Sequence, residues 1–196
     1  MWLQRFGAAS GVILGLSIGV PGAVEAFTGE TAATGAVLGL GVAFAAPTVT
    51  ALYLHQRERA GRFGAVAYAV NLLGLGLFTG VAFALNLVLF YLDDPVVTDL
   101  RAGPTGLALL GCALVFVAGT ILFSISMLRA GVFPRLPAAV YGVALTLLAV
   151  LAPLDDTPLT SAVHVLAAAA IIWLSLSTSG GYPQAENPVR PARAVA

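Results

Sequence analysis

The sequence predicts an all-α fold, a polytopic transmembrane bundle of six helices with both termini in the cytoplasm. Its composition is the first reason. Hydrophobic residues make up 59% of the chain and charged residues only 9%, whereas a soluble domain carries about 25% charged residues because its surface needs them. A chain so poor in charge has to face lipid over most of its surface. The other two reasons are six long apolar segments and the way charge alternates between them.

A helix needs about 20 apolar residues to cross the hydrocarbon core of a bilayer. Six segments meet this length: 7–27, 32–54, 63–92, 105–128, 136–154 and 159–177. None of them alternates apolar and polar residues with a period of two, so a barrel of strands is excluded. In lipid, single segments of this length satisfy their backbone hydrogen bonds only as helices.

Local signals support each segment in turn. In the first and second segments, Pro21 and Pro47 predict kinks. The third is long enough to overshoot the bilayer, which predicts a tilt or a protrusion. In the fifth, Pro137 lies close to the start, and the sixth begins with Thr157 as a cap before Pro158. The first segment also resembles a cleavable secretory signal, but it is longer than a typical signal core, which favours a retained helix.

Charge alternates between the gaps that separate these segments. Eight arginines share one set of gaps and ends: Arg5, Arg57, Arg59, Arg62, Arg129, Arg135, Arg190 and Arg193. Six acids share the other set: Glu30, Asp93, Asp94, Asp99, Asp155 and Asp156. Arg101 is the one arginine among these acids. Since short Arg-rich loops stay in the cytoplasm, both ends of the chain are predicted inside, in the cytoplasmic membrane.

The predicted domain organisation is simple. Residues 1–178 form the six-helix transmembrane domain, because the short loops leave no room for a soluble domain. Residues 179–196 contain a glycine pair and three prolines without apolar periodicity. This composition predicts a disordered cytoplasmic tail.

Glycines recur at helical spacing and predict close helix packing. Gly7, Gly11, Gly15 and Gly19 lie on one face of the first helix, and small residues let the backbones of membrane helices approach. Shorter steps occur at Gly35 and Gly39 and at Gly76 and Gly80. Packing within the bundle is the favoured interpretation. A homo-oligomer or a partner membrane protein is the alternative.

Polar residues within the apolar segments are candidates for function, because they are costly in lipid. Asn71, Thr79 and Asn86 share one face of the third helix at 100° per residue, where they form either interhelical hydrogen bonds or a polar seam for a solute. His164 and Glu25 are placed in the outer part of their helices, as Asn86 is. These three side chains are expected either to converge on a small cavity or to lie apart and play no role.

Other chemistry has little support in the sequence. Cys112 is the only cysteine and excludes a disulfide or a cysteine metal cluster. His55 and His164 lie at different depths, so they cannot hold a haem between them. No motif for a phosphate loop or a zinc protease occurs, and no basic run is long enough to indicate nucleic-acid binding. No cofactor, no metal and no catalytic residue are therefore predicted.

The segment Arg129-Ala130-Gly131-Val132-Phe133-Pro134-Arg135, followed by an Ala- and Leu-rich helix, resembles uncharacterised six-helix membrane proteins of high-GC Gram-positive bacteria. The resemblance implies the same six-helix architecture and brings no known activity. The sequence thus favours a non-enzymatic accessory or structural component that packs in the lipid bilayer. The alternative is a transporter or permease for a small solute or a lipid that uses the polar seam.

Overall fold

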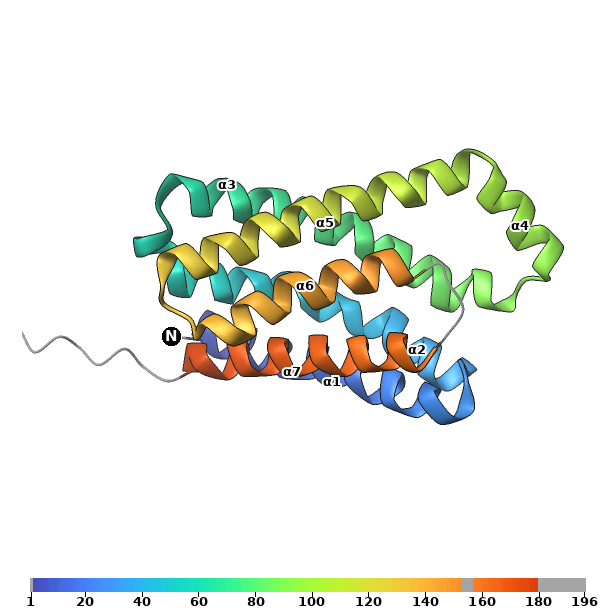
Figure 1. Cartoon of the computed structure of the whole chain (residues 1–196), viewed down its shortest axis with the longest axis horizontal. Helices are drawn as coiled ribbons and strands as arrows, with labels where there is room; N and C mark the ends of the chain where they lie inside the picture. Colours follow the sequence, from blue (N-terminus) through green and yellow to red (C-terminus); the bar gives the residue numbers. More distant parts are fainter. Residues whose placement is uncertain (1, 153–156, 180–196) are drawn as a thin grey trace, which may run out of the picture.

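The computed structural model describes residues 2–152 and 157–179, and these residues form helices without any strand. The elements are α1 (Trp2–Thr28), α2 (Ala32–Gly41), η1 (Val42–Phe44), α3 (Ala45–Leu87), η2 (Leu89–Tyr91), α4 (Asp94–Ala102), α5 (Pro104–Ala130), α6 (Arg135–Leu151) and α7 (Pro158–Ser179). Figure 1 shows the long helices lying side by side along one axis. The all-helical class is therefore confirmed.

Four stretches of helix are long and apolar enough to cross a membrane: Trp2–Thr28, Ala32–Tyr91, Pro104–Ala130 and Pro158–Thr178. The second has 60 residues, about three times what one crossing needs. It contains the second predicted segment and the third up to residue 91. The fifth predicted segment lies in the shorter apolar helix α6 up to residue 151, and its residues 153 and 154 are outside the described residues. The prediction of a membrane-embedded protein agrees with these helices.

Gly61 divides α3 into two arms, residues 45–60 and 62–87. Its φ of 57° and ψ of −155° are not helical, and only glycine adopts this combination without strain. The chain reverses there, so the two arms run in opposite directions (Figure 1). The sequence prediction of two separate helices on either side of residues 55–62 corresponds to these arms.

The predicted interruption near Pro47 lies just before it. The chain changes from α2 to the short 3-10 helix η1 and then to α3, and Pro47 falls in the first turn of α3. A proline is tolerated in the first turn because that turn's N–H groups have no helical acceptor. By contrast, α1 continues through Pro21.

The ends of several helices follow the predicted signals. Thr157 and Thr160 form a capping box at the start of α7, because the Thr157 N–H donates to Thr160 Oγ1 at 2.6 Å and the Thr160 N–H donates to Thr157 Oγ1 at 3.3 Å. Gly131 ends α5 in the left-handed conformation with φ 63°, as glycine commonly does after a helix. The turn then leads directly into α6.

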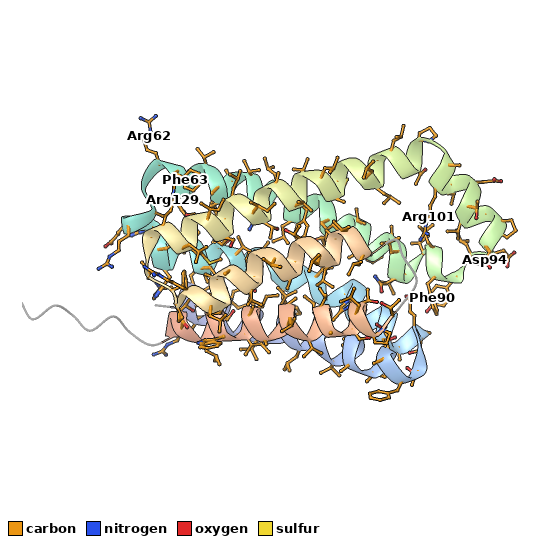
Figure 2. The ribbon with its side chains drawn as sticks, viewed as in Figure 1. Arg62, Phe63, Phe90, Asp94, Arg101 and Arg129 are labelled. Atoms are coloured by element: carbon orange, nitrogen blue, oxygen red, sulfur yellow. The ribbon has the colours of Figure 1, made fainter. Side chains whose placement is uncertain are left out.

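The two ends of the bundle differ in charge. Arg62 and Arg129 lie at the end that also holds the start of α1 and the last turn of α7, and we call it the arginine end (Figures 1 and 2). Arg129 contacts the Phe63 ring there at 5.0 Å from its centroid, a cation–π contact that ties α5 to α3. Asp94 lies at the opposite end, which we call the acidic end. Asp155, Asp156, Arg190 and Arg193 fall outside the described residues.

The glycine face of α1 lies inside the chain, against α7 and the first arm of α3. A Cβ atom at Gly7 would clash with Ala51, one at Gly11 would clash with Ser175, and one at Gly19 would lie 2.6 Å from Ala168 Cβ. At Gly15 the added atom would lie 2.5 Å from Ile172 Cγ1 and 3.0 Å from the Ala168 carbonyl oxygen. These helices approach so closely only because the side chains are missing.

On the third predicted helix, Gly76 and Gly80 were expected to pack against another helix of the bundle, and this prediction is wrong. A Cβ atom at either glycine would have no neighbour within 4 Å. The close approach is made instead by Gly74, where the added atom would lie 2.6 Å from Phe116 Cα, and by Gly119 of α5, where it would lie 2.5 Å from Asn71 Cα. The α3–α5 contact thus uses one glycine from each helix.

The close α1–α7 contact predicts that a glycine-to-leucine substitution in it lowers the unfolding temperature much more than the same substitution at an open position. Gly15→Leu places a side chain into Ile172 and the α7 backbone, so we expect the unfolding temperature in detergent to fall by several degrees, as overpacking costs about 1–3 kcal/mol. Gly76→Leu adds the same side chain at an open position of α3, so the unfolding temperature should stay within about one degree of the wild-type value. Equal effects of the two substitutions would contradict this packing.

Candidate functional site

A cavity of about 510 Å³ lies between the helices and opens at the acidic end. Its walls include the exposed residues Glu30, Asp94 and Arg101 at one end and the fully buried Thr48 and Tyr141 at the other. It therefore connects the surface with the middle of the bundle. Its size lies within the range of about 300–1,000 Å³ that small-molecule sites occupy.

The walls are mostly apolar. The central part is lined by Leu14, Ile18, Leu38, Val42, Val49, Leu75, Phe78, Leu85, Phe116, Leu145, Leu148 and Ile171. They come from α1, α2, η1, α3, α5, α6 and α7, so nearly every element of the bundle contributes. Phe78 and Phe116 stack with ring centroids 4.4 Å apart and form part of the wall where α3 meets α5.

The cavity extends about halfway through the bundle. Along α1 it reaches from Glu25 to Leu14 and along α3 from Asn86 to Leu75, which is about 16 Å in each case at 1.5 Å per residue. Towards the arginine end, the core residues Leu52, Phe123, Met127 and Leu174 are at most 1% exposed. The cavity is thus a blind pocket with its mouth at the acidic end.

The mouth contains three of the residues that the sequence singled out, because Glu25, Asn86 and His164 all line the same cavity. Gly22 brings α1 against α7 here, since a Cβ atom at Gly22 would clash with the His164 side chain. Glu25 lies one turn further along α1 on the same face. The structure therefore brings these three side chains to one site.

Glu25 is the most unusual of the three. Its side chain is only 6% exposed, and its Oε1 atom has no hydrogen-bond partner among the described residues. A buried polar atom normally has a partner, because leaving one without costs about 1–3 kcal/mol. Because Glu25 also lines the cavity, its carboxylate is a candidate to bind a polar group of a molecule held there.

Hydrogen bonds to the backbone orient the other two side chains. Asn86 Nδ2 donates to the Ala82 carbonyl oxygen at 2.8 Å. His164 Nδ1 lies 2.8 Å from the Thr160 carbonyl oxygen, and since a carbonyl only accepts, Nδ1 carries the proton. Asn86 Oδ1 and His164 Nε2 are consequently the acceptor atoms of these side chains when the imidazole is neutral.

Asn71 lies beside the base of the cavity and does not line it. Its Nδ2 donates to the Tyr141 hydroxyl oxygen at 3.3 Å, and its Oδ1 accepts from the Thr120 hydroxyl at 3.3 Å. These two bonds link α3, α5 and α6 at a position that is fully buried. The role of Asn71 is therefore to join three helices and to hold Tyr141 at the base.

Thr79 takes no part in the cavity. Its hydroxyl donates to the Leu75 carbonyl oxygen of its own helix at 2.8 Å, and its side chain is absent from the walls. The shared face that the sequence predicts for Asn71, Thr79 and Asn86 thus contains three different environments. They form no continuous polar seam.

Sequence reasoning missed α4 and its contribution to the mouth. Val97 and Arg101 lie four residues apart on one face of α4 and both line the cavity. Figure 2 shows Arg101 at the end of the bundle that also holds Phe90 and Asp94. Two signals were present in the sequence: the apolar residues Val96, Val97 and Leu100 recur at helical spacing, and Arg101 is the one arginine among the acidic gaps.

Comparisons with known proteins do not identify a relative. No protein-family model, no curated protein and no solved structure matches the chain. The resemblance of residues 129–135 to uncharacterised six-helix proteins stays a prediction.

The different environments of Asn71 and Thr79 predict that substitutions at these two positions of α3 change the free energy of unfolding by different amounts. Asn71→Ala removes both buried bonds and leaves the hydroxyls of Tyr141 and Thr120 without their partner, so we expect it to lower the free energy of unfolding by about 1–3 kcal/mol. Thr79→Val removes only a bond within its own turn and should change it by less than about 0.5 kcal/mol. Unfolding by denaturant in mixed micelles measures both, and a larger loss for Thr79→Val would contradict the assignment.

Proposed function

We propose that this protein is a non-enzymatic component of the cytoplasmic membrane that binds one lipid-like amphiphile in the cavity. The observation that carries the proposal is the division of the cavity into an apolar interior and a polar, charged mouth. An amphiphile has the same division. Its chain matches the interior, and its head group matches the side chains of Glu25, Asn86, His164 and Arg101.

The length of the cavity supports a single chain from one leaflet. The hydrocarbon core of a bilayer is about 30 Å thick, so one leaflet contributes about 15 Å. The cavity extends about the same distance between Asn86 and Leu75. An occupant that lies along the helices would thus keep its head group at the level of the lipid head groups.

The blind base favours binding over passage through the protein. A permease needs a route to both sides, and here the buried side chains of Phe123, Met127 and Leu174 separate the cavity from the arginine end. Of the two roles that the sequence left open, an accessory protein that holds a lipid therefore agrees better with the cavity than a permease does. The polar residues at its mouth are the part of the permease hypothesis that we retain.

We also infer that the arginine end faces the cytoplasm and that the cavity opens on the other side. The inference depends on the excess of arginine in the short connections at one end of the bundle. These connections contain Arg57, Arg59, Arg62, Arg129 and Arg135. Both termini would then be cytoplasmic, since the start of α1 and the last turn of α7 lie at the arginine end (Figure 1).

Cysteine labelling tests this orientation. In a Cys112→Ala background, Asp99→Cys should react with a membrane-impermeant maleimide in intact cells, because residue 99 is exposed at the acidic end. Arg59→Cys should react only after the membrane is permeabilised. Equal labelling of the two positions in intact cells would overturn the orientation.

A substitution that fills the cavity tests the binding proposal. Ala82→Phe adds a ring to a lining residue of α3, whereas Ala69→Phe adds the same ring to the exposed side of that helix. In nanodiscs, added dodecanol should raise the unfolding temperature of the wild type and of Ala69→Phe, because a ligand at 100 times its Kd stabilises by about 2.7 kcal/mol.

We expect the unfolding temperature of Ala82→Phe to respond no more than that of an unrelated membrane protein in the same nanodiscs. A wild type that responds to no dodecyl amphiphile, or a response that Ala82→Phe retains in full, would contradict binding in this cavity. Native mass spectrometry of the wild type gives a second readout through the mass of a retained amphiphile.

A further inference from the structure

The mouth of the cavity offers mainly hydrogen-bond acceptors, and this restricts the head group that fits it. Asn86 donates one N–H of its amide to the Ala82 carbonyl oxygen, and its Oδ1 is an acceptor. His164 uses the Nδ1 proton on the Thr160 carbonyl, which leaves Nε2 as an acceptor in the neutral ring. A bound group that supplies donors fits these two acceptor atoms.

Glu25 adds a third acceptor to the mouth. Glu25 is only 6% exposed, and its Oε1 atom has no hydrogen-bond partner among the described residues. It lines the same wall as His164. A carboxylate in this position is strongly stabilised by a donor that carries positive charge, since charge-assisted bonds are about twice as strong as neutral ones.

Acidic groups also dominate the rim. Glu30 and Asp94 line the mouth together with Arg101, so three carboxylates, counting Glu25, face one guanidinium. Glu30 lies close to Asn86, because an atom added at Gly35 would be 3.2 Å from the Asn86 carbonyl oxygen and 3.4 Å from Glu30 Oε1. The local excess of negative charge attracts cations and disfavours anions.

From these contacts we propose that the amphiphile bound in the cavity carries a primary ammonium head group, which donates its protons to Glu25, Asn86 Oδ1 and His164 Nε2. An ammonium has three donors and no acceptor, which matches three acceptor side chains. The apolar chain would lie along Leu75, Phe78 and Leu145 towards Tyr141. This inference rests on the proposed function and specifies the ligand class for it.

The experiment compares three probes with equal chains in nanodiscs of phosphatidylcholine: dodecylammonium, dodecanol and dodecanoate. Apparent affinity is obtained from the dependence of the unfolding temperature on probe concentration. The response of Ala82→Phe is subtracted for each probe, because it reports effects that arise outside the cavity. We expect the wild type to bind dodecylammonium roughly 10- to 100-fold more tightly than dodecanol.

Substitutions then test which side chain causes the preference for dodecylammonium over dodecanol. Glu25→Gln keeps the size of the side chain and removes its charge, so the ratio of the ammonium and alcohol affinities should fall to within about threefold of one. Asp99→Asn removes an exposed carboxylate of α4 that does not line the cavity, and it should leave the ratio unchanged. Binding of dodecanol by Glu25→Gln shows that this variant is folded.

The possible results separate the two proposals. If no probe distinguishes the wild type from Ala82→Phe, the proposed function fails and this inference fails with it. If the three probes bind equally, or dodecanoate binds most tightly, the ammonium head group is wrong while the cavity stays a site for amphiphiles. A preference that survives Glu25→Gln would also overturn the inference, because the charge would then lie elsewhere.

Discussion

The architecture depends on close approach between helix backbones at glycines. In lipid, apolar side chains gain little by moving from acyl chains to one another, so contact area and short separation have to hold the helices together. The glycines of α1 bring it against α7 and the first arm of α3, and Gly74 and Gly119 bring the second arm of α3 against α5. Each approach is possible only because the glycine at that position carries no Cβ atom.

The cavity lies where these approaches end. Beyond Gly74 and Gly119, the facing positions carry the rings of Phe78 and Phe116, and Ala82 and Leu85 of α3 continue the wall. The ends of α3 and α5 lie well apart at the acidic end, and η2 and α4 connect them (Figure 1). The space between the helices therefore follows from the positions at which glycine is replaced by bulky residues.

The sequence predicted much of this arrangement for clear physical reasons. Helix class and apolar segments follow from composition and length, and the packing face of α1 was recognisable because four glycines repeat at one spacing. Convergence of Glu25, Asn86 and His164 was one of two alternatives, since depth in the membrane is predictable and rotation about each helix axis is not. Rotation is fixed by contacts such as Gly22 against His164, which involve residues 142 positions apart in the chain.

Other features were out of reach because they depend on single backbone angles or on distant partners. Gly61 resembles any other glycine in the sequence, yet its φ of 57° lets α3 reverse. Gly76 and Gly80 show the spacing of a packing motif, but they face away from the chain because α5 contacts the side of α3 that carries Gly74. Spacing predicts which residues share a face and leaves open what that face contacts.

Arg101 shows that the pattern of charges along the chain indicates both the orientation of the bundle and a candidate functional residue. Topology needs only an excess of arginine at one end of the bundle, so a single arginine among the acids is an exception without effect on orientation. The structure places this exception on the wall of the cavity. Like the buried Glu25, it is a charged group at the boundary of the apolar region, where charge is costly and is retained chiefly for function. Departures from the topological pattern therefore mark candidate functional positions in a membrane protein of this kind.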